Sequence, residues 1–263
     1  MSDTVGVIGA GRMGLPIIGH LVDKGFRTLA ADIDLRRKPE VEARKAVWVS
    51  TEDLARESDV VLVCVGVDRE VQDLLKNAET FQGCIVAILS TIHPKTVRRV
   101  AEEAKGFHVI DSTVCRGGDA ADKGTLLSFV GGPKEVVERI TPVLRAYSSD
   151  VVHTGEVGSA QVAKAVNNLI MWACLVADHE GLALAKRCGV DVAMLRRALG
   201  ASSAQNAALD KWGTQTMAWA EDDMKIVAEM ATECGLKLPQ AELNREICRV
   251  LKPRRFKLDD YGV

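Results

Sequence analysis

A glycine-rich segment near the N-terminus has the spacing of a phosphate-binding turn. Gly9, Gly11 and Gly14 follow the apolar run Val5–Ile8 and open a helix-like segment. In such a turn the first glycine permits a tight bend, the second admits a pyrophosphate and the third lets helix and strand pack closely. The helix N-terminus then offers N–H groups to the phosphates. The spacing predicts dinucleotide binding by the whole turn, Gly9, Ala10, Gly11, Arg12, Met13 and Gly14.

An acidic residue stands at the end of the next predicted strand. Asp32 follows Gly14 by 18 positions. A carboxylate there hydrogen-bonds the ribose hydroxyls of NAD and repels the 2′-phosphate of NADP. Arg36 and Arg37 lie close behind and could attract that phosphate. The position therefore favours NAD, with NADP as the alternative.

Lys164 and Asn168 could transfer and orient a proton. They are four residues apart in a predicted helix, so their side chains share a face. The positive end of the helix disfavours the ammonium form of Lys164, so that its amine can take a hydroxyl proton. Asn168 offers a donor and an acceptor to a substrate or to the lysine. On residue type alone a solvated surface lysine is the simpler interpretation.

The patterns around these residues predict an α/β fold. Short apolar runs alternate with amphipathic segments over residues 1–155, which indicates a Rossmann domain with a parallel sheet covered on both faces. Residues 156–263 contain only helical patterns, so we expect an all-α substrate and oligomerisation domain, with a frayed tail from Pro253. The predicted strands are Val5–Ile8, Thr28–Ala31, Val60–Val65, Ile85–Leu89, Val109–Ile110, Leu126–Val130 and Val151–Val152; the predicted helices include Gly158–Gly189, Asp191–Leu199, Met217–Cys234 and Gln240–Leu251.

Composition narrows the class of partner. The 263-residue chain is 47% apolar, carries a net charge of −2 and has only 4% aromatic residues. These values argue against nucleic acid or an anionic membrane as the main partner. The N-terminus lacks a basic segment followed by an apolar one, so we expect a cytoplasmic protein. The seven cysteines include no Cys-x-x-Cys pair, and no His/Cys cluster has metal-ligand spacing, so no metal is predicted.

One helical segment indicates an oligomer. The run Leu169–Ala177 is apolar around the whole helix and is too short to span a bilayer. Such a helix must be covered on all sides. We expect the other domain and a second subunit to cover it, in a homodimer or a homotetramer.

Four ordered blocks resemble the β-hydroxyacid dehydrogenases, the family that includes 3-hydroxyisobutyrate dehydrogenase and tartronate semialdehyde reductase. GAGRMGLPIIGHL (Gly9–Leu21) resembles the opening of these enzymes, and STIHP (Ser90–Pro94) resembles their cofactor-contacting turn. DSTVCRGGDAADKGTL (Asp111–Leu126) resembles their substrate block, and GSAQVAKAVNN (Gly158–Asn168) resembles their catalytic block. The resemblance implies an NAD(P)-dependent oxidoreductase that acts on a small hydroxy acid or its semialdehyde.

The resemblance also implies roles for individual residues. Lys164 would be the general acid/base and Asn168 its orienting partner. The substrate's anionic group would lie against Cys115, Arg116 and Gly117. Four further positions are assigned to cofactor binding: Val65, Gly66, Thr91 and Asp222.

The sequence departs from the family pattern at two places. The family's Ser-Gly-Gly stands here as Cys115-Arg116-Gly117, so that a thiol replaces a hydroxyl; Arg116 either clamps an anion or points into solvent. At Asp222 the family usually has a lysine that reaches the cofactor, and Lys225 is one turn further on. Two alternatives therefore stay open: an imine reductase, which usually lacks the lysine at 164, and a cofactor-binding sensor without turnover.

Overall fold

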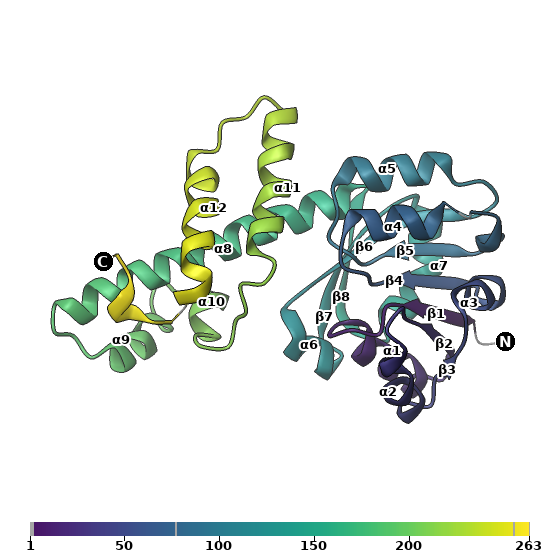
Figure 1. The fold of residues 1–263 in the computed structure, drawn as a ribbon, viewed down its shortest axis with the longest axis horizontal. Helices are drawn as coiled ribbons and strands as arrows, with labels where there is room; N and C mark the ends of the chain where they lie inside the picture. The colour runs from purple at the N-terminus through teal and green to yellow at the C-terminus, as the bar shows by residue number, and fades with distance from the viewer. Residues whose placement is uncertain (1–2, 77, 255, 263) are drawn as a thin grey trace. The chain divides into compact units, whose positions relative to one another are not determined.

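The computed structural model describes residues 3–76, 78–254 and 256–262 (Figure 1). By its contacts the chain divides into two compact units, Met1–Lys164 and Ala165–Val263. The sequence placed the boundary between residues 155 and 156, at the end of the last strand. The units divide later because a single helix, α8 (Ser159–Arg187), begins in the first unit and continues through the second.

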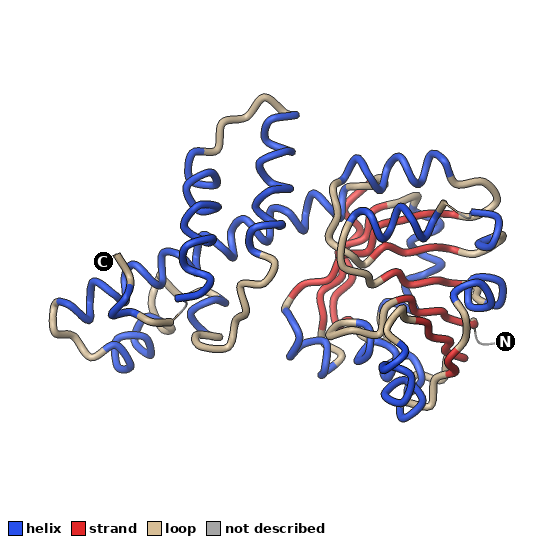
Figure 2. The backbone as a smooth tube through the Cα atoms, viewed as in Figure 1, coloured by secondary structure: helices blue, strands red, loops and turns tan. Residues whose placement is uncertain are grey.

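The first unit contains one eight-stranded sheet, whose strands are red in Figure 2. Its order is β3-β2-β1-β4-β5-β6-β7-β8. Each predicted strand lies in this sheet; the two-residue β3 was not predicted, because so short a run has no alternation to detect. The strands are β1 (Thr4–Ile8), β2 (Arg27–Ala31), β3 (Val47–Trp48), β4 (Val60–Val63), β5 (Ile85–Ile88), β6 (His108–Cys115), β7 (Leu126–Gly131) and β8 (Ser148–Gly155).

Helices cover both faces of this sheet, as the continuous apolar strands predict. One buried cluster joins strand side chains to α1, α2, α6 and α7, and a second joins them to α3, α4 and α5. Both clusters are built on strands such as β4, all four of whose residues are buried. The helices are α1 (Gly14–Asp23), α2 (Lys38–Ala43), α3 (Thr51–Glu57), α4 (Asp68–Leu75), α5 (Pro94–Glu103), α6 (Gly117–Lys123) and α7 (Lys134–Leu144).

The sheet is not entirely parallel, and the expectation of a parallel sheet was wrong for its last two strands. β7 pairs antiparallel with β6, and β8 pairs parallel with β7. Residues 116–125 connect β6 to β7 and contain only the short helix α6. A parallel crossover needs about a dozen residues or more, so this connection is too short to return the chain to the other end of the sheet.

The regular elements among the described residues of the second unit are all helices. α8 supplies Trp172, Leu175 and Val176 to a buried cluster completed by α11 and α12. The tail from Pro253 is not frayed over its described residues, because the Tyr261 hydroxyl donates to Glu180 and Arg187 donates to the carbonyl of Tyr261. The helices that follow α8 are α9 (Val192–Leu199), α10 (Ala207–Asp210), α11 (Ala220–Glu233) and α12 (Pro239–Leu251).

The apolar run Leu169–Ala177 lies within a helix, α8, that is longer than the run itself. That run is part of a 29-residue helix which, by length and composition alone, could cross a membrane. The core helix of a soluble protein passes the same test, so the observation is weak evidence for a membrane span.

Candidate active site at the carboxyl edge of the sheet

The strand order places the predicted cofactor residues at one edge of the sheet. β1 lies between β2 and β4, and the chain leaves β1 first toward β2 and β3 and later toward β4. Such a reversal opens a crevice at the carboxyl ends of the strands, where open α/β sheets bind their ligands. Gly9 follows β1, Asp32 follows β2 and Val65 lies just beyond β4, so all three residues lie at this edge.

The glycine turn has the backbone that a dinucleotide needs. Gly9 has a φ of 99°, and a Cβ there would overlap the carbonyl oxygen of Cys64. A Cβ at Gly14 would overlap the carbonyl oxygen of Gly9, while one at Gly11 would meet only open space. No side chain among the described residues caps the first turn of α1, and that turn contains no acidic residue. The turn therefore fits a pyrophosphate above Gly11 and the helix N-terminus.

Asp32, the residue expected to bind the ribose, supports the glycine turn. Its Oδ2 accepts the Ala10 N–H at 2.6 Å, and its Oδ1 accepts the Asp34 N–H at 2.8 Å. Each carboxylate oxygen has a second lone pair, which leaves acceptor capacity for ribose hydroxyls. Arg36 forms a two-point ion pair with Asp34, so its charge is already matched by a carboxylate. The preference for NAD over NADP stays a prediction.

The structure adds features near the glycine turn that sequence patterns missed. The Arg12 guanidinium forms two bonds to Asp122 of α6, at 2.8 and 2.7 Å, so its side chain links the turn to the substrate block. Ile33 and Leu35 are 95% and 73% exposed immediately after Asp32. Exposed apolar side chains at a ligand edge are candidates for packing against an adenine ring. Their only signal in the sequence is apolar character directly after a strand.

Lys164 lies in the second turn of α8, beside the end of β6. Its Nζ donates to the carbonyl oxygen of Val114 at 2.7 Å and lies 3.9 Å from the Cys115 Sγ. The start of α8 is fixed to the same strand, because the buried Asp111 accepts the N–H groups of Gly158 and Gln161 at 2.7 and 2.8 Å. Burial raises the pKa of the Asp111 carboxyl, although these two N–H donors oppose the rise. Lys164 itself is half-buried. Its amine is held by the Val114 carbonyl, and the start of its helix is held by Asp111.

Asn168 follows Lys164 by one helical turn. It is 4% exposed, and its Oδ1 accepts the Nδ2–H of Asn167 at 3.0 Å. Among the described hydrogen bonds, Lys164 is held by Val114 rather than by Asn168. Orientation of a substrate by Asn168 stays a prediction.

Arg116 does not point toward Lys164. Its guanidinium donates to the Thr125 carbonyl at 3.0 Å and to the Ser149 hydroxyl at 2.8 Å, and it pairs with Asp150 at 2.8 Å. Neither sequence interpretation, an anion clamp or a solvated side chain, anticipated this surface ion pair. Arg116 also has a φ of 83°, in the left-handed region that favours glycine. The family's glycine at this position is explained by this conformation, which glycine adopts without a steric cost.

The Cys115 thiol lies 3.9 Å from the Lys164 amine. The residue is 4% exposed, and burial raises the pKa of its thiol while the nearby Lys164 opposes the rise. A buried, uncharged thiol is a weak hydrogen-bond donor and a poor nucleophile. Gly117 has a φ of 75°, so two successive left-handed residues turn the chain from β6 into α6.

The segments after β4 and β5 complete this edge. The Val65 N–H donates to the Ser90 hydroxyl at 3.0 Å, and the Gly66 N–H donates to Glu70 at 2.7 Å. Thr91 lies between Ser90 and Ile92 in the turn after β5, half-buried. The structure thus brings Val65 to the turn that contains Thr91; cofactor contact by each stays a prediction.

Comparison with known proteins identifies the family. The profile described as the NAD binding domain of 6-phosphogluconate dehydrogenase matches residues 4–155, and that described as the NAD-binding of NADP-dependent 3-hydroxyisobutyrate dehydrogenase matches residues 158–261. The chain belongs to the β-hydroxyacid dehydrogenase family. It is an NAD(P)-dependent oxidoreductase of the hydroxyacid dehydrogenase class.

Individual members of this family and of the same fold are similar over most of the chain. The 3-hydroxyisobutyrate dehydrogenase of Pseudomonas aeruginosa is 31% identical over 78% of this chain and 72% of its own length. A solved structure of Mycobacterium tuberculosis 3-hydroxyisobutyrate dehydrogenase with L-serine superposes with a TM-score of 0.88, at 21% identity, over 97% of this chain and 95% of that one. A Streptomyces aurantiacus imine reductase gives 0.69 at 17% identity, over 94% of each chain.

Asp222 belongs to the second unit. It stands where β-hydroxyacid dehydrogenases usually have a lysine. Asp222 is exposed in the first turn of α11, beside Glu221 and Asp223. Acidic side chains stabilise a helix N-terminus. The neighbouring Asp223 accepts the indole N–H of the buried Trp172 at 2.9 Å. The position of Asp222 in the first turn of α11 suits an acidic residue, and its contact with the cofactor stays a prediction.

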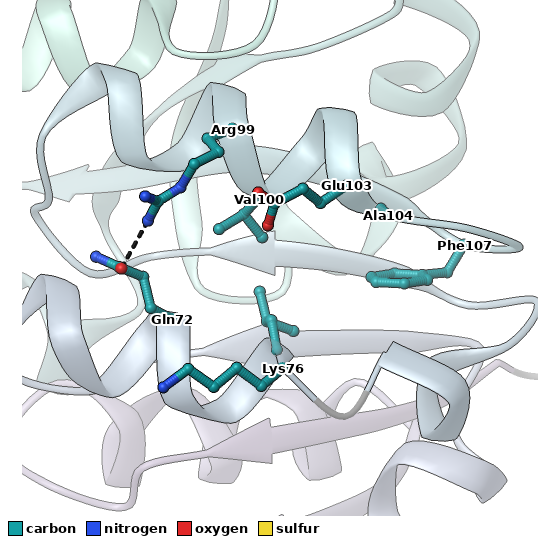
Figure 3. A pocket seen from close by; sticks show the side chains of 8 residues that line it. Gln72, Lys76, Arg99, Val100, Glu103, Ala104 and Phe107 are labelled. Carbon is teal, nitrogen blue, oxygen red and sulfur yellow. Dashed lines mark hydrogen bonds between the residues drawn. The ribbon is translucent and has the colours of Figure 1, made fainter.

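A surface cavity of this dehydrogenase lies away from the predicted site residues. It has a volume of about 250 Å³ and lies between α4 and α5. Figure 3 shows Arg99 bridging to Gln72 across it, at 2.6 Å, with Phe107 at its other end. None of the residues assigned to the cofactor, the substrate or proton transfer lines it. The predicted site at the carboxyl edge of the sheet and this cavity therefore share no lining residue.

Proposed function

We propose that this protein oxidises a small 3-hydroxy acid, or reduces the corresponding semialdehyde, with Lys164 as the general acid/base. The observation that carries the proposal is the position of the Lys164 amine beside the end of β6, held by the Val114 carbonyl at 2.7 Å. This end of β6 lies along the same edge of the sheet as the glycine turn.

The two halves of the reaction fall to different groups. NAD(P), which the turn Gly9–Gly14 and Asp32 would hold, would supply the hydride acceptor in oxidation and the hydride donor in reduction. In oxidation the neutral Lys164 amine takes the hydroxyl proton as the carbonyl forms, and in reduction the ammonium returns it. One N–H of Lys164 donates to the Val114 carbonyl, which holds the nitrogen beside the end of β6.

The substrate's anionic group is assigned to the main chain of residues 115–117. The guanidinium of Arg116 is paired with Asp150, so the backbone N–H groups of this turn, rather than that side chain, are the proposed ligands. Asn168 orients the substrate from the next turn of α8. Asp32 selects NAD over NADP through the ribose.

A homodimer or homotetramer is the proposed assembly. Val166, Ile170 and Leu184 of α8 are 49%, 58% and 66% exposed, and they lie at helical spacing along one side of the helix. A subunit that packs there would remove this apolar surface from water.

Substitution of Lys164 tests the chemistry. Lys164→Ala should lower kcat by about 10²–10⁴ while the Kd for NAD changes little, since the cofactor is bound by the glycine turn and Asp32. Lys164→Arg should be equally impaired, because a guanidinium stays charged and cannot accept the proton. Lys134→Ala, at an exposed lysine of α7, is the matched control. Near wild-type kcat in Lys164→Ala would contradict the proposal.

The same assay separates the alternatives. A sensor without turnover would have no activity for Lys164→Ala to remove. An imine reductase would reduce cyclic imines and leave hydroxy acids unchanged. The presence of a lysine at 164 favours the dehydrogenase.

A further inference from the structure

Gln161 is a buried polar side chain that no step above uses. It is 1% exposed and lies three residues before Lys164 on α8. Its Oε1 accepts the Ile92 N–H at 3.0 Å, and its Nε2 donates to the Ser90 carbonyl at 2.8 Å. Both ends of the amide therefore bond to the main chain of the turn after β5, which is the turn predicted to contact the cofactor.

This turn is fixed to its other neighbours as well. The Ser90 hydroxyl accepts the Val65 N–H, which joins the turn to the segment after β4. At the other end of the turn, Asp68 of α4 accepts the Thr96 hydroxyl at 2.7 Å and the His93 N–H at 3.2 Å. The turn thus has a defined position relative to the sheet before α8 is considered.

The start of α8 is fixed to a different strand. Asp111 of β6 accepts the main-chain N–H of Gln161, and the Thr113 hydroxyl donates to the Ala160 carbonyl at 3.0 Å. Lys164 reaches the same strand through the Val114 carbonyl. The Gln161 side chain then spans from this anchored helix to the turn after β5.

We propose that Gln161 is a positioning residue that sets the spacing between the cofactor turn at Ser90–Ile92 and the Nζ of Lys164. Its two bonds hold the hydride side and the proton side of the reaction at one distance. The inference rests on the proposed function, because it gives Lys164 the proton-transfer role. Loss of these bonds leaves the lysine in place on β6 and frees the turn to shift relative to it.

Gln161→Glu provides a switchable test. The protonated acid copies the amide, since its O–H donates to the Ser90 carbonyl and its C=O accepts the Ile92 N–H. The ionised form has no donor and places a negative charge against that carbonyl. Burial disfavours ionisation, so the titration should lie above the ordinary glutamic acid value of about 4.3.

The expected result is an additional limb in the pH profile. At the acid end Gln161→Glu should have a kcat within about threefold of wild type. As pH rises and the acid ionises, kcat should fall by about 10- to 100-fold and the Kd for NAD, measured by equilibrium fluorescence titration, should rise over the same range. Gln161→Leu, which can form neither bond, should be impaired at every pH without this limb.

Two controls isolate the effect. Gln82→Glu makes the same change at an exposed glutamine whose Nε2 donates to the Lys105 carbonyl, and it should leave both profiles unchanged. Asp111, which accepts the main-chain N–H of Gln161, is unchanged in every variant, as are His93 and Lys164, so the wild-type and Gln161→Leu profiles subtract any contribution from these groups. Thermal unfolding at each pH shows whether the samples stay folded at the assay temperature.

Flat kcat and Kd profiles for Gln161→Glu in folded samples would overturn the inference, as would a change in thermal stability alone. The comparison with Lys164→Ala keeps the two proposals apart. If Lys164→Ala is inactive and Gln161→Glu is flat, only the positioning role fails. If Lys164→Ala retains turnover, the proton-transfer role fails, while the pH-dependent Kd for NAD still reports whether Gln161 holds the turn. The Gln161→Glu test compares one purified sample at several pH values. It therefore stays interpretable even if the Gln161→Leu variant does not fold.

Discussion

The backbone of Arg116 offers a sharp test of the structure. With a φ of 83° and a ψ of −2°, this non-glycine residue has a left-handed conformation. For an L-residue that conformation costs about 1–2 kcal/mol, and glycine avoids the cost. The ion pair between the Arg116 side chain and Asp150 offsets part of this conformational cost. That pair is 43% and 52% exposed, so it contributes about 0.2–1 kcal/mol.

Two substitutions separate these contributions. Arg116→Ala and Arg116→Gly both lose the guanidinium, so the difference between them reports only the backbone. We expect the glycine variant to be more stable by about 1 kcal/mol. Relative to wild type, the alanine variant should lose about 0.5–1 kcal/mol, whereas the glycine variant should be unchanged or slightly more stable.

Thermal unfolding measures this difference. For a unit of this size, about 1 kcal/mol corresponds to a Tm difference of about 2–4 °C. Asp119 is the matched control, because it is exposed in the helix α6, where alanine is preferred over glycine by about 1 kcal/mol and the order should reverse. An Arg116→Ala variant as stable as Arg116→Gly would refute the left-handed assignment. Both Arg116 variants should also keep the substrate KM within about twofold, whereas a guanidinium that clamped the substrate anion would make KM rise in both.

Three further predictions follow from other contacts. Asp32→Ala should raise the Kd for NAD at least about tenfold and improve NADP relative to NAD in an equilibrium titration, because charge-assisted bonds to the ribose are lost; a wild type that prefers NADP would contradict this. Burial lowers the pKa of His179, whose Nδ1–H donates to Leu175 and whose Nε2 accepts the Phe256 N–H. Stability from this histidine should be complete above its unfolded value of about 6.5 and be lost as pH falls toward the folded value, so the Tm of wild type should drop more than that of His179→Gln between about pH 7.5 and 5.5. Ile170→Glu should convert the expected oligomer to a monomer in sedimentation, and a monomeric wild type at micromolar concentration would contradict the assembly.

The parts of this molecule that sequence predicts well are those governed by local rules. The strand, glycine turn and helix from Val5 onward obey short-range steric requirements, and the structure shows an overlap for a Cβ at both Gly9 and Gly14. The helix that carries Lys164 was expected over Gly158–Gly189 and is observed over Ser159–Arg187. Each of these elements is specified by residues within one or two turns of it.

The parts that sequence missed depend on partners far along the chain. The Val114 carbonyl that holds Lys164 is 50 residues away, and a main-chain acceptor has no signature in residue types. Asp150, the partner of Arg116, is one of many surface acids. The reversal of β7 could have been predicted from the short connection at residues 116–125, because its length alone excludes a parallel crossover. The conformation of Arg116 was also accessible, since the family's glycine at that position indicates a left-handed residue.

The division of α8 separates two kinds of determinant in this enzyme. Lys164, the Asp111 cap and the Gln161 bridge all belong to the first unit, which also contains the glycine turn and Asp32. The proposed proton acceptor Lys164 and the turn at Ser90–Ile92 therefore lie in one compact unit. Asn168 and Asp222 belong to the second unit. If Lys164 and Gln161 act as proposed, substitutions at Asn168 or Asp222 should leave the positions of these two side chains unchanged, because both are bonded to β6 or to the turn after β5 within the first unit.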